Sequence, residues 1–348
     1  MKIQIIYFNN FGPLENQTLD FYDDWSDKIF SRVLFSGPNG SGKSLVFRAI
    51  AELWQATGYW LENRDKLPHN NTSTRNWLEQ WGGIALVLTE LPFVSGSVGL
   101  VFGESAWFKK IEMAHSEVQW LGEVSKNKKS VLLLPQTEWL NHWAEARNKL
   151  IVSFEAADTP NVIYLDAEEC RWVSTKRRVG KILPEDTSSR WLVKYKATED
   201  WQGQLESSLV NLKAVELHKY HRLIRELNHC LYGKEINHEI KRIDGKNRLQ
   251  VSLHKKRGQS HLLDILSAGE RQVLIKLYLV SRWLEPGGLV MIDEPDLYLH
   301  PSVVYSFLAR VESQVEEKKG QLLIASHSPD VWNRYDTRDQ LIELGDNL

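Results

Sequence analysis

Residues 37–44, GPNGSGKS, form the segment whose residue types and spacing point most directly to chemistry. The segment fits the pattern G-x-x-x-x-G-K-[S/T], in which glycines let backbone N–H groups approach phosphate oxygens without an intervening side chain. Lys43 can reach the β- and γ-phosphates, and the hydroxyl of Ser44 suits Mg²⁺. The pattern predicts an ATP-binding loop made of Gly37, Pro38, Asn39, Gly40, Ser41, Gly42, Lys43 and Ser44.

Two carboxylates follow an apolar run near the other end of the chain, in GGLVMIDEP (287–295). On a buried strand Asp293 would emerge at the carboxyl edge of the sheet, where open α/β folds bind ligands. There Asp293 can hold Mg²⁺ through water, and Glu294 can polarise the attacking water as a general base. His327, in LIASHSP, follows another apolar run and can hydrogen-bond the γ-phosphate and that water.

We therefore expect a site that binds ATP and Mg²⁺ and hydrolyses ATP. The catalytic residues would be Lys43, Glu294 and His327, and the residues at the metal would be Ser44 and Asp293.

The elements that must position these residues alternate between strands and helices. The P-loop lies between an apolar strand and a helix, which is the context such a loop requires. The C-terminal part predicts an α/β arrangement, with helices at 270–284 and 302–318 and strands at 287–293, 321–326 and 340–344.

The middle of the chain predicts other elements. Strand-like runs at 83–91, 97–103 and 105–113 indicate an antiparallel meander. Apolar residues within 205–231 are spaced three and four apart, which predicts one long helix. The remaining expected elements are a strand at 2–8, a loop at 63–76, a helix at 137–149, and strands at 161–169, 235–243 and 247–256.

The heptapeptide LSAGERQ (266–272) resembles the signature motif of the ABC-type ATPases, with Ala268 in place of the commoner first glycine. The order of motifs matches as well: P-loop, long middle, signature, MIDEP and ASHSP. In that superfamily the signature completes the site of a second subunit, so the resemblance implies that Ser267, Gly269 and Glu270 contact ATP bound by another copy. The implied fold class is an α/β P-loop NTPase of ABC-ATPase type, with a mixed central sheet, an antiparallel β-subdomain and a helical lid insertion.

The continuation IDEPDLYLHP and the opening KIQIIYFNNFGPLENQTLDF resemble the ATPases grouped with the overcoming-lysogenization-defect proteins and their relatives in bacterial phage defence. The resemblance implies an ATPase with slow turnover that assembles with itself around ATP, as a dimer or higher oligomer. It also implies a separate effector protein, such as a nuclease or toxin, that this ATPase controls.

The implied organisation divides the chain into four segments. They are the N-terminal part of the ATPase head with the P-loop (1–62), an antiparallel β and helical subdomain (63–170), a helical lid (171–260), and the C-terminal part of the head with the signature, the carboxylates and His327 (261–348). The glutamine-loop residue of the superfamily stays open, because Gln136 resembles the transporter version and the stretch after Leu165 resembles the defence version.

Other functions stay open as alternatives. An ATP-bound scaffold with little hydrolysis fits the same motifs, whereas LYLHP disfavours a transporter motor. A DNA-repair ATPase would need a long coiled coil, but Ser44 and Ser267 are only 223 positions apart. Since 21 residues follow His327, we do not expect a nuclease domain of about 100 residues in this chain.

The composition limits the partners. The formal net charge of the 348 residues is −2, so no global basic field attracts nucleic acid, although basic clusters at 126–129, 176–181 and 255–257 leave local contacts open. Two distant cysteines, Cys170 and Cys230, and the lack of any apolar run near ~18 residues predict a cytoplasmic protein with no membrane contact. His218 and His221 are more typical of a solvated pair than of a metal site. We expect the 14 tryptophans to serve packing and interfaces.

Overall fold

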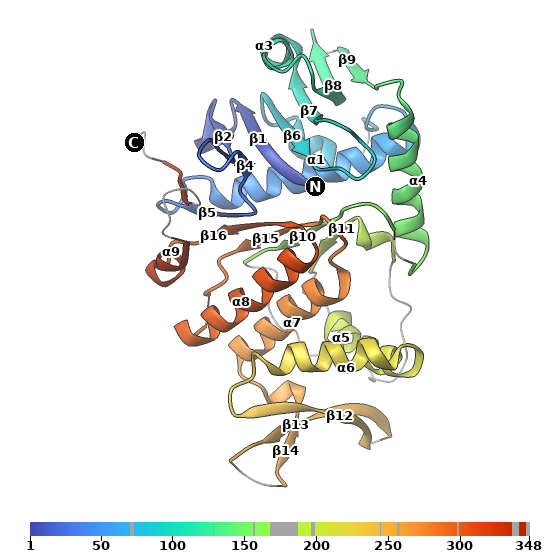
Figure 1. Ribbon diagram of the computed structural model, residues 1–348, viewed down its shortest axis with the longest axis vertical. Helices are drawn as coiled ribbons and strands as arrows, with labels where there is room; N and C mark the ends of the chain where they lie inside the picture. Colours follow the sequence, from blue (N-terminus) through green and yellow to red (C-terminus); the bar gives the residue numbers. More distant parts are fainter. Residues whose placement is uncertain are drawn as a thin grey trace.

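Helix α1 (Lys43–Asn63) lies between two six-stranded sheets in the computed structural model of the chain (Figure 1). The structure describes residues 1–69, 73–127, 129–155, 157–167, 187–195, 199–243, 245–255, 258–297, 299–335 and 341–345. Within these ranges no helix is both long and apolar enough to cross a membrane.

The first sheet is parallel in every pairing and carries the P-loop. Its strand order is β11-β10-β15-β16-β5-β17. The strands are β5 (Arg32–Ser36), β10 (Val162–Leu165), β11 (Leu192–Lys194), β15 (Leu289–Asp293), β16 (Gln321–Ala325) and β17 (Leu341–Glu343). Asp293 pairs with Ala325, and Ala325 pairs with Phe35, so the carboxyl ends of three strands share one edge.

The second sheet has the order β2-β1-β6-β7-β8-β9 and is antiparallel except between β7 and β8. Its strands are β1 (Lys2–Asn9), β2 (Thr18–Asp20), β6 (Gly83–Thr89), β7 (Val98–Glu104), β8 (Gln119–Lys126) and β9 (Lys129–Leu133). A small hairpin, β3 (Tyr22–Asp23) with β4 (Lys28–Ile29), follows β2.

The strand expected at 105–113 is wrong, because these residues form helix α3 (Ser105–Ala114). Phe108 and Ile111 are three positions apart and are both buried, which is the spacing of one helical face. The helix connects β7 to β8 and lets them pair in parallel, so the expected antiparallel meander holds only for β6 and β7. The loop expected at 63–76 also ends early, since α2 (Ser73–Leu78) begins inside it.

Helices α7 (Ala268–Trp283) and α8 (Pro301–Glu317) cover the face of the parallel sheet opposite to α1 (Figure 1). Strand β15 is buried on both faces: Leu289 and Met291 belong to the core with α1, and Val290 and Ile292 belong to the core with α7 and α8. The remaining helices of the head are α4 (Glu138–Val152), α9 (Pro329–Tyr335) and the short 3-10 helices η1 (Gly12–Leu14), η2 (Thr187–Arg190) and η3 (Leu263–Ile265).

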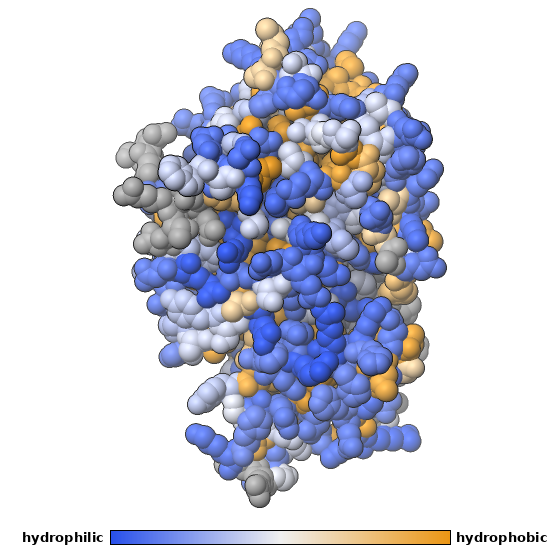
Figure 2. Space-filling view, viewed as in Figure 1, coloured by the Kyte–Doolittle hydropathy of each residue, from blue (hydrophilic) through white to orange (hydrophobic). Residues whose placement is uncertain are grey.

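Beyond α7 lies a region that we call the lid, which comprises α5 (Glu199–Val215), α6 (Leu217–Asn228) and the sheet of β12 (Lys234–Ile243), β13 (Lys246–Leu253) and β14 (Ser260–Leu262). The single helix expected at 205–231 is wrong, because Glu216 has φ −138° and ψ 75° and separates α5 from α6. Both helices pack into one core, through Leu209 and Leu212 on α5 and Ile224 and Leu227 on α6. In Figure 2 the visible surface over the lower, lid end is mostly hydrophilic.

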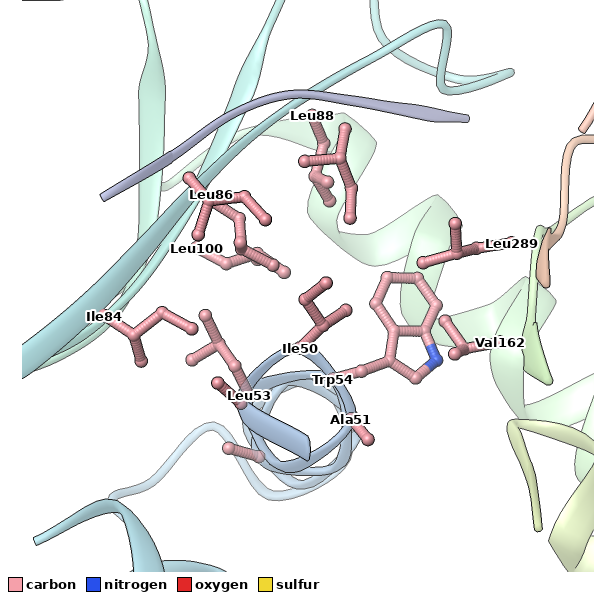
Figure 3. Close-up of a cluster of buried hydrophobic side chains, with 14 of the residues drawn as sticks. Ile50, Ala51, Leu53, Trp54, Ile84, Leu86, Leu88, Leu100, Val162 and Leu289 are labelled. Carbon is pink, nitrogen blue, oxygen red and sulfur yellow. The ribbon is translucent and has the colours of Figure 1, made fainter. Parts of the chain in front are cut away.

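Helix α1 is anchored by apolar contacts on both sides. Figure 3 shows Ile50, Leu53 and Trp54 between Leu86 and Leu100 of the second sheet and Val162 and Leu289 of the parallel sheet. The indole of Trp54 stacks on that of Trp191 at 4.2 Å between ring centroids. Each indole N–H donates to the other residue's carbonyl at 2.9 Å, so both polar atoms are satisfied where water is excluded. These tryptophans serve packing, as expected.

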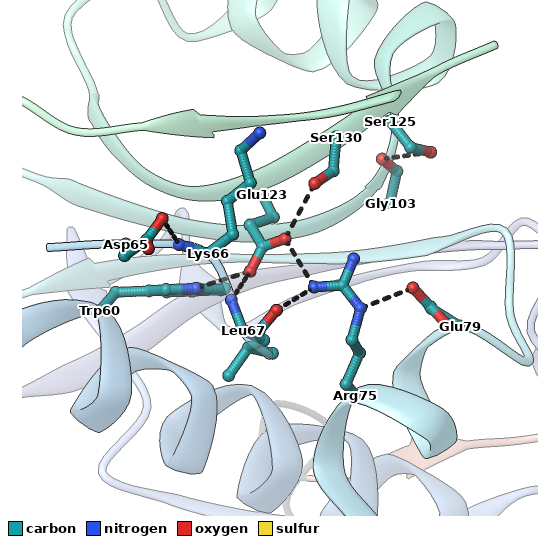
Figure 4. Close-up of polar contacts among 10 residues, drawn as sticks. All are labelled: Trp60, Asp65, Lys66, Leu67, Arg75, Glu79, Gly103, Glu123, Ser125 and Ser130. Carbon is teal, nitrogen blue, oxygen red and sulfur yellow. Dashed lines mark hydrogen bonds and ion pairs between the residues drawn. The ribbon is translucent and has the colours of Figure 1, made fainter. Parts of the chain in front are cut away.

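A buried ion pair fixes the chain after α1 (Figure 4). The carboxylate of Glu123 on β8 accepts hydrogen bonds from the Trp60 indole at 3.0 Å, the Leu67 backbone N–H, and Arg75 at 3.2 Å. The side chains of Arg75 and Glu123 are 3% and 1% exposed. Arg75 also contacts Glu79 at 2.8 Å, but the Glu79 side chain is 49% exposed, so Glu123 is the buried partner of Arg75.

Glu123→Gln should lower the free energy of unfolding by about 3 kcal/mol, because Arg75 would keep its buried charge and lose its buried partner. Glu155→Gln is a suitable control: it removes the Lys149–Glu155 pair, whose side chains are 52% and 74% exposed. That control should cost less than about 1 kcal/mol. Urea unfolding followed by tryptophan fluorescence measures both changes, and equal losses for the two variants would contradict this role of Glu123.

Candidate nucleotide-binding site

The P-loop connects β5 to α1 and depends on two glycines. Gly37 has φ +138°, and a Cβ there would lie 2.2 Å from the carbonyl oxygen of Leu344. Gly42 has φ +100°, and its Cβ would lie 2.7 Å from Leu14. Side chains are therefore excluded on both sides, and the loop turns directly into α1, whose N-terminus carries a partial positive charge.

Lys43 is the first residue of α1 and is 6% exposed. Its ammonium donates to the carbonyl oxygens of Gly37 at 2.8 Å and Pro38 at 3.1 Å, so the charge is held inside the loop. The same ammonium can exchange these neutral acceptors for phosphate oxygens, which form stronger, charge-assisted hydrogen bonds.

Ser44 and Asp293 come together, as the sequence predicts. Asp293 is 3% exposed at the end of β15, and Ser44 lies close enough to affect the pKa of its carboxyl group. Burial raises the pKa of Asp293 to about 6; the hydroxyl of Ser44 opposes this rise, and the carboxylates of Glu294 and Asp166 add to it. Among the described residues, Asp293 Oδ1 finds no hydrogen-bond donor.

Glu294 and His327 are also neighbours. His327 Nδ1 lies 3.0 Å from Glu294 Oε1, and the hydrogen bond and charge of Glu294 raise the pKa of His327. Glu294 adopts φ +46°, a conformation that is uncommon outside glycine, while its N–H donates to the carbonyl of Ala325 at 2.8 Å. This backbone turn follows the buried strand directly and brings the general base expected from the sequence beside His327.

The loop that carries His327 is anchored by three hydrogen bonds. The hydroxyl of Ser326 donates to Asp296 at 2.8 Å and accepts from the backbone of Ser328 at 3.0 Å. The indole of Trp332 donates to the carbonyl of Ser326 at 2.9 Å. These contacts fix the backbone on both sides of His327, so its ring is presented from a rigid support.

The signature residues lie elsewhere, at the N-terminus of α7 on the other face of the parallel sheet (Figure 1). Ser267 is exposed and caps the helix, because its hydroxyl accepts from the N–H of Glu270 at 3.3 Å and the Glu270 carboxylate accepts from the N–H of Ser267 at 2.8 Å. Gly269 is half-buried in the first turn. Contacts of Ser267, Gly269 and Glu270 with nucleotide stay a prediction.

Sequence reasoning did not single out two charged residues near Asp293. Leu165 pairs with Ile292, so Asp166 follows β10 beside Asp293, and Tyr164 donates to Asp166 at 2.9 Å. Asp166, directly after Leu165, therefore lies at the site, whereas Gln136 is exposed between β9 and α4. Lys276 on α7 is 1% exposed, and its positive charge opposes part of the rise in the pKa of Asp293. The signals were an acidic residue ending an apolar strand and one lysine inside the apolar run VLIKLYLV.

Several other expected features lie wholly or partly outside the described residues. Of the basic clusters, Lys128, Lys176, Arg177, Arg178, Lys181, Lys256 and Arg257 lie outside the described residues, as does Cys170. His221 lies 3.4 Å from His238 between Nδ1 atoms. In the part of the chain that the structure describes, no group of three or more His, Cys, Asp or Glu residues could hold a metal.

The residues present fit ATP and Mg²⁺. Gly37 and Gly42 permit the backbone conformation of a phosphate-binding loop, because a Cβ at either position would collide with Leu344 or Leu14. Asp293 Oδ1 and Ser41 Oγ are buried and find no hydrogen-bond partner among the described residues, so a bound ligand would supply one. Ser44 and Asp293 offer the oxygen ligands that Mg²⁺ prefers.

Solved structures of other proteins match the fold of this chain. Two of the matching solved structures are an SMC head domain from Thermotoga maritima (15% identity, 99% of this chain, 94% of that chain, TM-score 0.47) and an SmcHead bound to the C-winged helix domain of ScpA (12% identity, 99% and 97%, TM-score 0.52). The expected fold class is confirmed: this is an α/β P-loop NTPase fold similar to SMC ATPase heads, with a mixed sheet, antiparallel strands and several helices.

The family follows from a model that matches residues 34–331, which is most of the chain. The chain belongs to the family described as "AAA domain, putative AbiEii toxin, Type IV TA system". It therefore contains an AAA-type P-loop ATPase domain, a class that generally binds ATP with Mg²⁺. A search of curated proteins found no match to the sequence.

Asp293→Asn should stabilise the nucleotide-free protein at pH 8. Because the folded protein holds the Asp293 proton more tightly than the unfolded chain, stability falls as pH rises from about 4 to about 6 and stays low above that. The neutral amide avoids this cost, so we expect a gain of about 3 kcal/mol at pH 8 and a smaller one at pH 5. Urea unfolding at both pH values measures the gain, and calorimetry should show weaker Mg²⁺-dependent ATP binding. No difference in stability at pH 8 would contradict a buried charge on Asp293.

Proposed function

We propose that this chain is an ATP-driven switch, in which the P-loop of one copy and the signature of a second copy enclose ATP. One observation carries the proposal. Ser44, Asp293, Glu294 and His327 converge beside the P-loop, while the exposed Ser267 caps a helix on the opposite face of the same sheet. Such a chain can contribute its P-loop surface to one ATP site and its signature surface to a second ATP site.

The chain's own residues supply the steps of ATP hydrolysis. The Lys43 ammonium and the first turn of α1 bind the phosphates. Ser44 and Asp293 would hold Mg²⁺, which would supply positive charge to offset the charge of the phosphates. Glu294 accepts a proton from the attacking water, and His327, hydrogen-bonded to Glu294, orients that carboxylate. Ser267 and Gly269 of the second copy contact the γ-phosphate, and the Glu270 carboxylate keeps their backbone in place.

The switch would act on a separate effector in bacterial phage defence. The motif IDEPDLYLHP and the opening KIQIIYFNNFGPLENQTLDF support this through their resemblance to defence ATPases. The family description, which includes the words "putative AbiEii toxin, Type IV TA system", agrees with a toxin-related setting. ATP binding would join the copies, hydrolysis would release them, and the lid would pass the change to the effector.

A mixing experiment tests the shared site. Lys43→Ala and Ser267→Arg should each abolish ATPase activity, the first by removing the phosphate contact and the second by placing a bulky cation where the phosphate must approach. In a mixed dimer, the intact P-loop of the Ser267→Arg copy meets the intact Ser267 of the Lys43→Ala copy. One site is then whole, and ATPase activity should return in a steady-state assay.

Calorimetry provides the control, because Ser267→Arg alone should still bind ATP through its own P-loop and Lys43→Ala should not. The mixed dimer is verified by native mass spectrometry with differently tagged copies. A verified mixed dimer that binds ATP but recovers no activity would count against the shared site.

A further inference from the structure

Two cationic side chains of the lid sheet form ion pairs with acidic residues on the two sides of Ser267. Lys234, the first residue of β12, lies 2.8 Å from Glu270 Oε1. Arg248 on β13 lies 2.9 Å from Asp264 Oδ2. Glu270 follows Ser267 by three positions and Asp264 precedes it by three. The lid therefore forms an ion pair at each end of segment 264–270, which would face a second copy.

The Lys234 contact acts on the helix cap itself. Glu270 Oε2 accepts from Lys234 at 2.9 Å and from the backbone N–H of Ser267 at 2.8 Å. The same oxygen therefore links the lid to the residue whose hydroxyl would meet the phosphate. The side chains of Lys234 and Glu270 are 26% and 17% exposed, so water screens this pair only in part.

The Arg248 contact reaches into the lid core. Arg248 Nε lies 2.9 and 3.0 Å from the two carboxylate oxygens of Glu206 on α5, which also accepts from the N–H of Leu249 at 2.8 Å. The side chains of Arg248 and Glu206 are 11% and 4% exposed, and charges at such depth stay paired because separating them is costly. A displacement of α5 would therefore move the partner of Asp264.

We propose that Lys234 and Arg248 are positioning residues for the signature, and that through them the lid sets how well one copy completes the ATP site of another. This inference rests on the proposed shared site. A movement of the lid would then shift Ser267 and change the rate of hydrolysis, since a misplacement of about 1 Å at a reacting group costs roughly a hundredfold in rate.

The first test replaces Lys234, which is the less buried of the two cations. Lys234→Met should lower kcat by roughly tenfold to a hundredfold and leave ATP affinity unchanged, because the P-loop of the same copy is untouched. Lys234→Arg should restore most of kcat by restoring the charge. Arg222→Met is the matched control: it removes a lid ion pair with Glu317, 61% and 57% exposed, that does not involve the signature, and kcat should stay at the parent value.

Asp264→Asn provides a second variant if Lys234→Met fails to fold. It weakens the ion pair between Arg248 and Asp264, which lies N-terminal to Ser267, and leaves the buried Arg248–Glu206 pair intact. It should also lower kcat at unchanged ATP affinity. Parent values of kcat in both folded variants would overturn the proposal.

Mixing separates this inference from the shared site on which it rests. Lys234→Met should regain activity when mixed with Lys43→Ala, because the defect lies on the signature side, and should gain nothing with Ser267→Arg. If Lys43→Ala and Ser267→Arg do not complement each other, the shared site fails. If they do, and Lys234→Met also gains activity with Ser267→Arg, the positioning role of Lys234 is wrong.

Discussion

The burial of α1 between two sheets is the constraint on which the site depends. The helix can pack on both sides because its apolar residues cover most of its circumference, and Trp54 locks it to Trp191 through reciprocal hydrogen bonds. Its N-terminus is thereby fixed at the carboxyl edge of the parallel sheet, where β15 and β16 end. The parallel pairing of β15, β16 and β5 brings Asp293, the loop of His327 and the P-loop to the same edge.

The charges of the site lower the stability of the folded protein. Asp293 is buried beside Glu294 and Asp166, and Lys276 of α7 offsets only part of the repulsion. Glu294 adds a left-handed backbone at the next position. A core selected for stability alone would avoid these features, whereas a site that must bind a cation and orient a water needs them. Lys276 lies on α7, the helix that begins at the signature, so its charge acts on Asp293 from that helix.

The sequence predicted the site better than the middle of the chain, for a physical reason. The P-loop, Asp293–Glu294 and His327 are short segments whose residue types are dictated by local backbone geometry and by the ligand. The helix at 105–114 and the break at Glu216 depend on which surfaces the apolar residues find, and short apolar runs suit helix and strand alike. Asp166 and the pair Lys234–Glu270 depend on contacts between segments that are distant in sequence, which no local pattern encodes.

The central claim is that ATP joins two copies of the chain across its two separated surfaces. The most direct measurement is the molar mass by light scattering of Glu294→Gln, which keeps the shape of the site and removes the base, with Mg²⁺ and either ATP or ADP. The account predicts a mass of 40.3 kDa with ADP and about twice that with ATP. A variant that binds ATP by calorimetry and stays at 40.3 kDa would contradict the account.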